Sequence, residues 1–587
     1  MNLSLSGRRA CAALVLVAAG FLAGCASPPA PPAPAVTQAG ADLEIRFTPR
    51  RADGDKVTAV DVTLLIRRPG LAAGETALSG AVMRLMAPGG VKPETLQALD
   101  SAGPFVLTVE DDPADPTDFR QDRRWIASRA SEGDLRVVYT LQPRAITSAT
   151  RPGPLVDIRT ERTGVYGAGY TMLALPVSGW PRDTAVSWDL SEMEPGARAA
   201  SSLGEGEARA TVTAHDLYTS FFMAGPLLSE PPDGASDFSV YWMTPAAFDL
   251  GRSAAWTEKA YRFFAEFFGT NATPFRVFMR TTERFQGGGG GGFNSFIFGT
   301  VFGEDRKPHE VQTLLAHEAL HHFVGGYGGE GGGAGGQQWY SEGVTSYYTI
   351  VLPYRAGLTS LENYIDAFNA HSVSYFTNPR SNLSNVEVTR LFFADRNAQI
   401  VPYNRGPLYI ALLDARIRNA SGGALRVDDL IADFIAGQEA AEDGVALWHD
   451  LTEIYLGEAG GTEFRAMMAG ELLDLPPDLF GPCFTPEDRM LHNFSIGFRP
   501  YKDEDGQVRA GPVTTLSSAE SAGILRFDII LNPGVLDAAP KTAPGSEVTL
   551  DISRESERLT ITYAPWTDPA PGRIWARTGA SETECNL

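Results

Sequence analysis

The chain has 587 residues and a formal net charge of −22, from 49 lysines and arginines against 71 aspartates and glutamates. Hydrophobic residues make up 43% and charged residues 20% of the sequence, which is typical of a folded globular protein and excludes broad disorder. Because nucleic-acid binding depends on neutralising phosphates, so acidic a chain is not expected to bind nucleic acid. At about 100–200 residues per domain, the length predicts three or four domains.

Residues 1–24 have the parts of a secretory signal peptide. Arg8 and Arg9 give a positively charged start, and Ala12–Leu22 is the apolar stretch. The sequence LAGC, which ends at Cys25, is a lipobox. We therefore predict cleavage before Cys25 and a lipid anchor on this cysteine. The alternative, a transmembrane anchor, is disfavoured because the apolar stretch is short for a bilayer.

Residues 25–42 are rich in proline and alanine and predict an extended, semi-rigid tether. Ala26 follows the lipid-bearing cysteine. In the bacterial lipoproteins that this start resembles, a residue other than aspartate at that position usually directs sorting to the outer membrane. The resemblance thus implies a protein of the bacterial cell envelope, lipid-anchored on the periplasmic face of the outer membrane.

Two cysteines, Cys483 and Cys585, remain after the lipidated one. An oxidising compartment would let them form a disulfide. Their spacing of about a hundred residues gives no geometric support, so a disulfide and two separate thiols stay open as alternatives.

Hydrophobic patterning divides the rest of the chain into three regions, a multidomain α+β organisation. Residues 43–222 alternate apolar and polar side chains in short runs such as Leu135–Leu141, which predicts a β-sandwich-like domain. Residues 488–575 return to strand patterns and predict a small β domain. Between them, residues 223–480 predict a mostly helical domain, with helices near 256–268, 309–324, 339–352, 360–371, 404–418, 426–437 and 444–456.

His317, Glu318 and His321 form the pattern H-E-x-x-H on one of these helices. Positions i and i+4 share a helical face, so both imidazoles can point at a single ion. Glu318 can accept a proton from the attacking water and pass it to a leaving amine, as a general base does. Neutral imidazoles suit Zn²⁺, which needs three protein ligands and one open position for catalysis.

Glu342 is the predicted third ligand, because it begins the next predicted helix within W-Y-S-E-G-V-T. An antiparallel neighbour of the first helix would bring its carboxylate to the histidines and complete a site for one zinc ion. The alternative is a helix with ordinary packed histidines. His322 points about 100° away from His321 and is expected to support the site or to be exposed. Five other histidines lack ligand-like spacing and are expected to be structural: His215, His309, His371, His449 and His492.

These motifs resemble the glycyl aminopeptidase family of bacterial zinc metallopeptidases, gluzincins that carry a PDZ domain and are distantly similar to aminopeptidase N. The family's W-x-x-E-G-x-T is matched by Trp339, Glu342, Gly343 and Thr345. The resemblance implies peptide or protein substrates. It also implies an N-terminal β domain over 43–222, a thermolysin-like catalytic domain over 223–480 and a PDZ-like domain over 488–575.

A third family pattern, Y-x-[KR]-G followed by L-L-D-x-x-[IL]-R, is matched between Tyr403 and Arg418. In the related aminopeptidase N group the tyrosine hydroxyl at this position faces the metal and stabilises the oxyanion of the tetrahedral intermediate. The resemblance therefore implies that Tyr403 is the oxyanion donor. From the residues alone, the alternative is a packed aromatic side chain at the start of a helix.

The chain departs from the family in two places. The family's G-G-x-E-H-type strand edges the cleft and corresponds here to Gly291, Gly292 and Asn294, the predicted substrate-binding residues. In the aminopeptidase N group a glutamate at the third of these positions binds the substrate's α-amine. A neutral amide cannot neutralise an ammonium, so aminopeptidase and endopeptidase action both stay open. The family's G-D-x-I motif lacks its glycine at Arg526–Ile530, so the PDZ-like domain is expected to be degenerate.

Glycine is in excess, with 61 residues against about 41 from average usage. Gly287–Gly292 leads into the predicted cleft strand, and nine more glycines between Gly325 and Gly336 link the helix of His317 to that of Glu342. One interpretation is two flexible loops. The other is two walls of one active site that become ordered when a peptide binds.

The sequence therefore predicts a membrane-anchored zinc metallopeptidase in which Glu318 is the general base. The alternative is a non-catalytic, lipid-tethered peptide-binding protein that retains the peptidase fold. The complete ligand set and Glu318 favour the enzyme. The predicted partners are a peptide substrate and, through Cys25, the membrane; the sequence does not indicate an oligomeric state.

Overall fold

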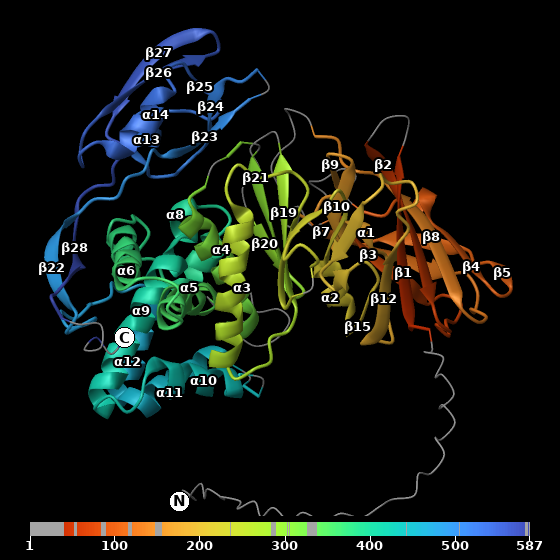
Figure 1. Ribbon diagram of the computed structural model, residues 1–587, viewed down its shortest axis with the longest axis horizontal. Coiled ribbons are helices and arrows are strands. Elements are labelled where there is room, and N and C mark those ends of the chain that lie inside the picture. Colours follow the sequence, from red (N-terminus) through yellow and green to blue (C-terminus); the bar gives the residue numbers. More distant parts are fainter. Residues whose placement is uncertain are drawn as a thin grey trace, which may run out of the picture. The chain divides into compact units, whose positions relative to one another are not determined.

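The structure is a computed structural model. It describes residues 40–51, 56–83, 90–114, 120–146, 155–234, 236–282, 289–301, 303–304, 306–325, 337–438, 440–441, 443–503, 505–580, 585 and 587. The predicted signal peptide, Cys25 and most of the tether lie outside the described residues, as do 287–288 and 326–336 of the glycine runs. Residues 41–587 make up one structural unit, shown in Figure 1. None of the described helices is long and apolar enough to cross a bilayer.

Three sheets build the N-terminal β region, which confirms the strands predicted there. A seven-stranded sheet has the order β15-β12-β1-β2-β8-β4-β5, and a four-stranded sheet (β11-β3-β7-β6) and a five-stranded sheet (β14-β13-β16-β10-β9) share its hydrophobic core. Buried and exposed positions alternate along strands such as β8, as the period-2 pattern predicts. The strand bounds are β1 (Leu43–Arg51), β2 (Val57–Ile66), β3 (Thr76–Met83), β4 (Gln97–Asp100), β5 (Gly103–Pro104), β6 (Leu107–Asp111), β7 (Arg120–Ala127), β8 (Leu135–Leu141), β9 (Arg159–Glu161), β10 (Gly164–Ala168), β11 (Leu175–Pro176), β12 (Arg182–Trp188), β13 (Arg198–Ser201), β14 (Gly204–Glu205), β15 (Ala208–Val212) and β16 (Phe221–Gly225).

The middle region is not only helical, because it begins with a five-stranded sheet of order β17-β18-β19-β21-β20. Strands β18, β19 and β21 run parallel, and β20 pairs antiparallel with β21 at the edge. The inner strands are covered on both faces and read as continuous apolar runs, so they lack the alternation that identifies a half-exposed strand. The bounds are β17 (Leu228–Glu230), β18 (Phe238–Trp242), β19 (Phe275–Thr282), β20 (Gly289–Gly292) and β21 (Ser295–Val301).

The predicted helices are all present and share one hydrophobic core. Three further helices, α7, α8 and α12, escaped prediction. Helix α12 begins Glu458-Ala459-Gly460-Gly461, and glycine disfavours helix; yet a Cβ on Gly460 would lie 2.5 Å from the Thr452 carbonyl oxygen, so this glycine permits a close approach of α11 and α12. The bounds are α3 (Leu250–Phe267), α4 (Pro308–Val324), α5 (Gln338–Arg355), α6 (Leu361–Phe376), α7 (Asn385–Leu391), α8 (Arg396–Gln399), α9 (Val401–Ser421), α10 (Val427–Gly437), α11 (Gly444–Leu456) and α12 (Glu458–Ala469).

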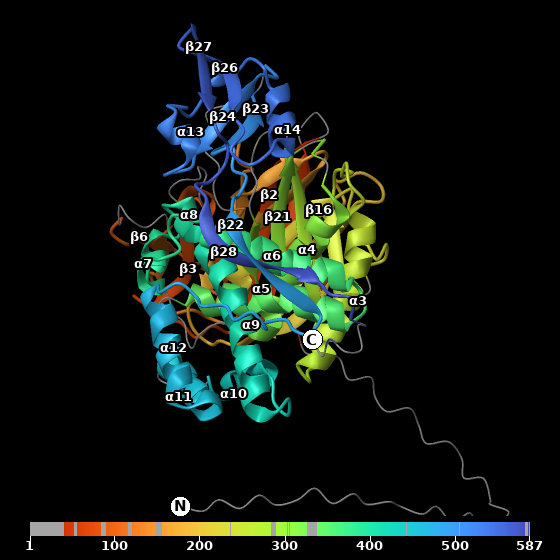
Figure 2. The same cartoon turned by 90° about the vertical axis from the view of Figure 1, so that its left-hand side faces the viewer.

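The C-terminal part leaves and rejoins the helices through a two-stranded antiparallel ribbon of β22 (Phe484–Leu491) and β28 (Ala570–Arg577). Figure 2 shows β28 passing along α6. Between the two strands, the chain forms a five-stranded sheet of order β23-β24-β25-β26-β27. Its PDZ-like character stays a prediction. The strands are β23 (Phe498–Lys502), β24 (Val508–Val513), β25 (Ile529–Ile530), β26 (Val548–Arg554) and β27 (Glu557–Tyr563).

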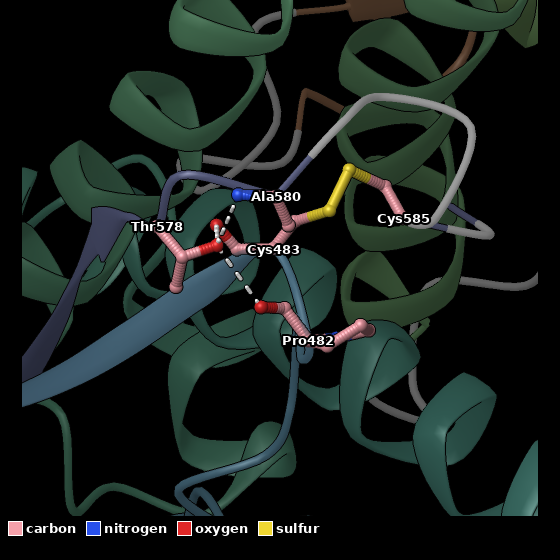
Figure 3. Close-up of a disulfide and its surroundings, with 5 residues drawn as sticks. All are labelled: Pro482, Cys483, Thr578, Ala580 and Cys585. Atoms are coloured by element: carbon pink, nitrogen blue, oxygen red, sulfur yellow. Dashed lines mark hydrogen bonds between the residues drawn. A yellow bond between two sulfur atoms is a disulfide. The ribbon is translucent and has the colours of Figure 1, made fainter.

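A disulfide between Cys483 and Cys585 closes this ribbon at its base, as Figure 3 shows. The two Cα atoms lie 5.2 Å apart, within the usual range for a disulfide. Thr578 adds hydrogen bonds from its hydroxyl to the carbonyl oxygens of Cys483 (2.9 Å) and Pro482 (3.1 Å). Of the two alternatives left open by the sequence, the structure has the paired cysteines.

Helices α5 and α9 cross at Gly343 and Gly406, where the two backbones are in direct contact. A Cβ on Gly406 would lie 2.2 Å from the Gly343 Cα atom, and a Cβ on Gly343 would lie 2.6 Å from the Gly406 Cα atom. Both distances are too short for any side chain, so the crossing requires glycine in both helices. Each glycine belongs to a motif singled out in the sequence, W-x-x-E-G-x-T and Y-x-[KR]-G.

We expect Gly406→Ala to lower stability by about 1–3 kcal/mol, because the helices must separate to admit the methyl group. The measurement is urea unfolding followed by circular dichroism. Gly251→Ala in α3 is the matched control, since its Cβ would meet nothing closer than 3.7 Å, and alanine there should be neutral or stabilising by up to about 1 kcal/mol. Equal stability of the two variants would contradict the packing account.

Candidate metal centre

Helix α4 carries the H-E-x-x-H pattern and is well anchored. Pro308 occupies its first turn, where a missing N–H costs nothing. Leu315, Ala319 and Leu320 are buried and fix the orientation of the helix. The two histidines of the pattern therefore face away from this apolar surface, toward α5.

The structure brings His317, His321 and Glu342 together. His317 Nε2 lies 3.2 Å from His321 Nε2 and 3.2 Å from Glu342 Oε2, and His321 Nε2 lies 3.4 Å from the same oxygen. A tetrahedral centre with Zn–N and Zn–O bonds of about 2.0–2.1 Å places neighbouring ligand atoms about 3.3 Å apart. The three side chains thus have the spacing and chemistry of a two-histidine, one-glutamate zinc site, and they form the one candidate metal cluster among the described residues.

The environment shifts the pKa values of the three clustered groups in different directions. Burial lowers the pKa of His317, which favours the neutral imidazole. Burial also acts on Glu342, but its hydrogen bonds with both histidines outweigh it and keep the pKa of the carboxyl well below its usual value. For His321 the effect of burial is likewise outweighed by Glu342, and the pKa is raised.

Thr345, one turn after Glu342 on α5, fixes the second histidine. Its hydroxyl oxygen lies 3.3 Å from His321 Nδ1. If Nδ1–H donates to this hydroxyl, Nε2 keeps its lone pair for a metal. This contact gives a physical role to the threonine of the W-x-x-E-G-x-T motif.

Glu318 lines the same cleft but is not one of the three clustered residues. Burial raises the pKa of its carboxyl to about 7. A carboxyl group that titrates near neutral pH is suited to accept and return a proton. This placement agrees with the predicted role of general base, which stays a prediction.

Tyr403 reaches the cluster from the first turn of α9. The centroids of its ring and the His317 ring lie 5.8 Å apart. Burial, together with the neighbouring carboxylates of Glu342 and Glu318, raises the pKa of the phenol well above its usual value. The hydroxyl therefore keeps its proton at neutral pH and can donate a hydrogen bond to an oxyanion.

The two residues that follow Tyr403 in the chain, Asn404 and Arg405, hold the first turn of α9 in place. The Asn404 side chain accepts from His371 Nδ1 of α6 (3.0 Å) and donates to the Ser374 hydroxyl (2.9 Å). The Arg405 guanidinium is fully buried and donates to the carbonyl oxygens of Ser381 and Leu383, both at 2.7 Å. Spacing in the sequence gave no sign of the His371–Asn404 contact; His371 agrees with its predicted structural role.

Helix α6 also joins the site to the C-terminal ribbon. On the side of β28, Asn369 exchanges two hydrogen bonds of 2.8 Å with the main chain of Trp575. Ser372 donates to the Arg573 carbonyl oxygen. The same helix thus contacts the disulfide-closed ribbon and, through His371 and Ser374, the segment that carries Tyr403.

A cleft of about 600 Å³ opens in front of the cluster. It is lined by the predicted substrate-binding residues Gly291, Gly292 and Asn294, together with Glu318, His321 and Glu342. Helix α2 (Ala214–Thr219) also contributes to the lining and packs against β20. A Cβ on Gly292 would lie 2.1 Å from the Thr219 carbonyl oxygen, so glycine is needed for β20 to approach α2.

Sequence reasoning did not place α2 in the cleft. His215, which was expected to be structural, lines it together with Asp216 and Thr219. Asp216 also caps its own helix, because its Oδ2 accepts from the Thr213 main-chain N–H at 2.8 Å. No sequence pattern indicated that these residues line the cleft, because they lie about a hundred positions before the H-E-x-x-H pattern and belong to no motif.

The chain is similar to known proteins in part of its sequence and in its fold. Residues 334–400 match the M61 glycyl aminopeptidase family, which confirms the resemblance inferred from the motifs. An aminopeptidase N family protein from Idiomarina loihiensis is similar in structure, with a TM-score of 0.58, 15% identity, and coverage of 93% of this chain and 99% of that chain. At this identity the similarity shows the fold.

Two structures of an M1 zinc metallopeptidase from Deinococcus radiodurans are also similar. A variant bound to a Tyr-Ser-Ala substrate has a TM-score of 0.43 at 15% identity, covering 74% of this chain and 95% of that chain. A second structure, of the metallopeptidase itself, has a TM-score of 0.41 at 15% identity, covering 75% of this chain and 96% of that chain. No curated protein matches the sequence significantly.

We expect the purified protein to hold about one zinc per chain, and His317→Ala or Glu342→Gln to hold much less, because each removes one of three ligands. The measurement is mass-spectrometric metal analysis after dialysis. His322→Ala is the matched control, since this imidazole lies beside His321 on the same helix but contacts the Thr273 hydroxyl. Full zinc occupancy in His317→Ala, or an equal loss in His322→Ala, would contradict the assignment.

Proposed function

We propose that the protein is a zinc metallopeptidase with His317, His321 and Glu342 as ligands of one Zn²⁺ ion. The observation that supports this most strongly is the mutual spacing of 3.2–3.4 Å among the three ligand atoms. Glu318 lines the same cleft, and Tyr403 packs beside His317. The match to a peptidase family supports peptide-bond hydrolysis as the reaction.

A zinc ion held there supplies Lewis-acid polarisation of the scissile carbonyl and activation of water. The protein's own residues move the proton. Glu318 accepts it from the attacking water, and the protonated carboxyl then donates it to the leaving amine as the C–N bond breaks. A pKa near 7 lets this one group serve as base and then as acid.

Tyr403 is proposed to stabilise the oxyanion that develops on the carbonyl oxygen. Its raised pKa keeps the hydroxyl protonated. Arg405 and Asn404 hold the first turn of α9, so the hydroxyl needs little reorganisation during the reaction.

The cleft suits an extended peptide whose main chain runs beside β20. Asn294 can hydrogen-bond a substrate amine but carries no charge. Asp216 is a cleft-lining carboxylate outside the predicted catalytic set, and Thr213 occupies one of its oxygens. Asp216 is thus a carboxylate that could bind the free α-amine of a substrate with its remaining oxygen. Comparing the cleavage of peptides with free and with blocked N-termini distinguishes aminopeptidase from endopeptidase action.

The lipobox at Cys25 supports a further proposal, that the enzyme is tethered by lipid to the periplasmic face of the outer membrane. The Cys483–Cys585 disulfide agrees with an oxidising compartment. The sheet of β23–β27 is proposed to be the degenerate PDZ-like domain.

We expect Glu318→Gln to lower kcat by about 10²–10⁴-fold while zinc is retained, because it removes the base and leaves the ligands intact. Tyr403→Phe should lower kcat by about 10²–10³-fold with little change in KM, because its hydroxyl acts mainly on the transition state. The measurement is mass-spectrometric cleavage of mixed peptides with free and acetylated N-termini, with and without a chelator.

Tyr455→Phe is the matched control for Tyr403→Phe, since it deletes a phenol hydroxyl that contacts Asp433 on an outer helix. It should cleave at the wild-type rate. Binding of peptides without chelator-sensitive cleavage would favour the non-catalytic alternative. Full activity of Glu318→Gln would exclude the proposed mechanism.

A further inference from the structure

A group of buried charges joins the N-terminal β region to strand β19, away from the predicted metal ligands. Asp157, whose side chain is fully buried, accepts hydrogen bonds from three guanidinium groups. Arg280 Nη1 donates to Oδ1 at 2.9 Å, while Arg159 Nε (2.6 Å) and Arg144 Nη1 (3.2 Å) donate to Oδ2. The Arg280 guanidinium also lies over the Tyr166 ring, 5.4 Å from its centroid. We call Arg144, Arg159 and Arg280 the arginine cluster.

A second carboxyl group beside the cluster, Glu161, is already engaged. Its Oε1 accepts from the Thr244 main-chain N–H at 3.0 Å, and its Oε2 accepts from the Thr281 main-chain N–H at 2.8 Å. Both oxygens of Asp157 are likewise occupied. Among the described contacts, neither carboxyl group accepts from the two terminal nitrogens of Arg159.

One edge of the Arg159 guanidinium is left without a partner in the part of the chain that the structure describes. This residue is 2% exposed, and its Nε is used by Asp157. Its two terminal nitrogens, Nη1 and Nη2, are buried and have no hydrogen-bond partner among the described residues. A guanidinium edge left without partners in the interior is costly, because its N–H groups lose water and gain nothing in return.

We propose that the Nη1–Nη2 edge of Arg159 binds one small monovalent anion, chloride in ordinary buffers. A negative charge complements the cationic edge of Arg159, and an acceptor without protons suits an edge that offers only donors. The full burial of Arg280 and Asp157 favours a compact halide over a polyatomic anion. Since Asp157 and Arg159 belong to the N-terminal β region and Arg280 to β19, the bound anion would strengthen the junction between them.

Thermal unfolding at constant ionic strength tests this, with sodium chloride replaced stepwise by sodium gluconate, whose anion is too large for the site. A ligand that binds only the folded state stabilises it by mass action. We expect the unfolding midpoint to rise by about 1–2 °C for each tenfold increase in chloride above its dissociation constant. Arg159→Gln should lose this dependence.

Arg46→Gln is the matched control, because it removes an arginine whose ion pair with Asp189 is exposed. It should keep the chloride dependence of the wild-type protein. A midpoint that is independent of chloride in the wild-type protein, or a dependence that persists unchanged in Arg159→Gln, would overturn the proposal.

A crystal of the wild-type protein grown in sodium bromide gives a test that does not depend on a variant folding. The expected result is an anomalous difference peak about 3.3 Å from Arg159 Nη1 and Nη2, a hydrogen-bonding distance for a halide. Ordered water at that position without anomalous signal, or a direct protein partner for both nitrogens, would contradict an anion site.

Discussion

The contact between Gly343 and Gly406 is the constraint on which the candidate centre depends. It lets α5 and α9 approach until their backbones touch. Glu342 precedes the first glycine, and Tyr403 stands about one turn before the second, so the same crossing delivers a carboxylate and a phenol to the imidazoles of α4. Side chains at the crossing would force the two helices apart and so move the carboxylate and the phenol from their places.

The clustered side chains also pose an electrostatic problem that a cation solves. Two imidazole nitrogens and a carboxylate oxygen lie 3.2–3.4 Å apart in a half-buried position, where lone pairs and negative charge repel unless a proton or a cation lies between them. Burial lowers the pKa of His317, while Glu342 raises the pKa of His321, so a proton at this point favours His321. A positive charge at that point would also favour the ionised form of Glu318, and so make the base available at neutral pH.

The sequence predicted the site better than it predicted its surroundings. The spacing in H-E-x-x-H follows from helical geometry, so α4 and its two histidines were predictable from local sequence alone. Glu342 was predicted from its place at the start of the next helix, whereas the role of Tyr403 needed the family resemblance, because packing between helices joins it to the first motif. The contact of His371 with Asn404 and the place of Asp216 in the cleft were not predicted, since they depend on the packing of α6 and α2, which no local pattern encodes.

The same distinction between local and long-range information holds for the fold. Alternating strands of the N-terminal region and the main helices carry strong periodicity and were predicted. The parallel strands β18, β19 and β21 were missed because they are apolar on both faces. The pairing of Cys483 with Cys585 was undecided, because the ribbon of β22 and β28 brings the cysteines together across 102 residues.

The central claim is that a single metal ion held by α4 and α5 makes this protein a peptidase. Its most direct test is to strip the full chain with a chelator, titrate it with Zn²⁺, and follow cleavage of a peptide mixture. The account predicts no cleavage in the stripped protein and a linear recovery of activity that reaches its plateau at one equivalent of zinc. Cleavage that survives stripping, or that fails to return with zinc while the protein remains folded, would contradict it.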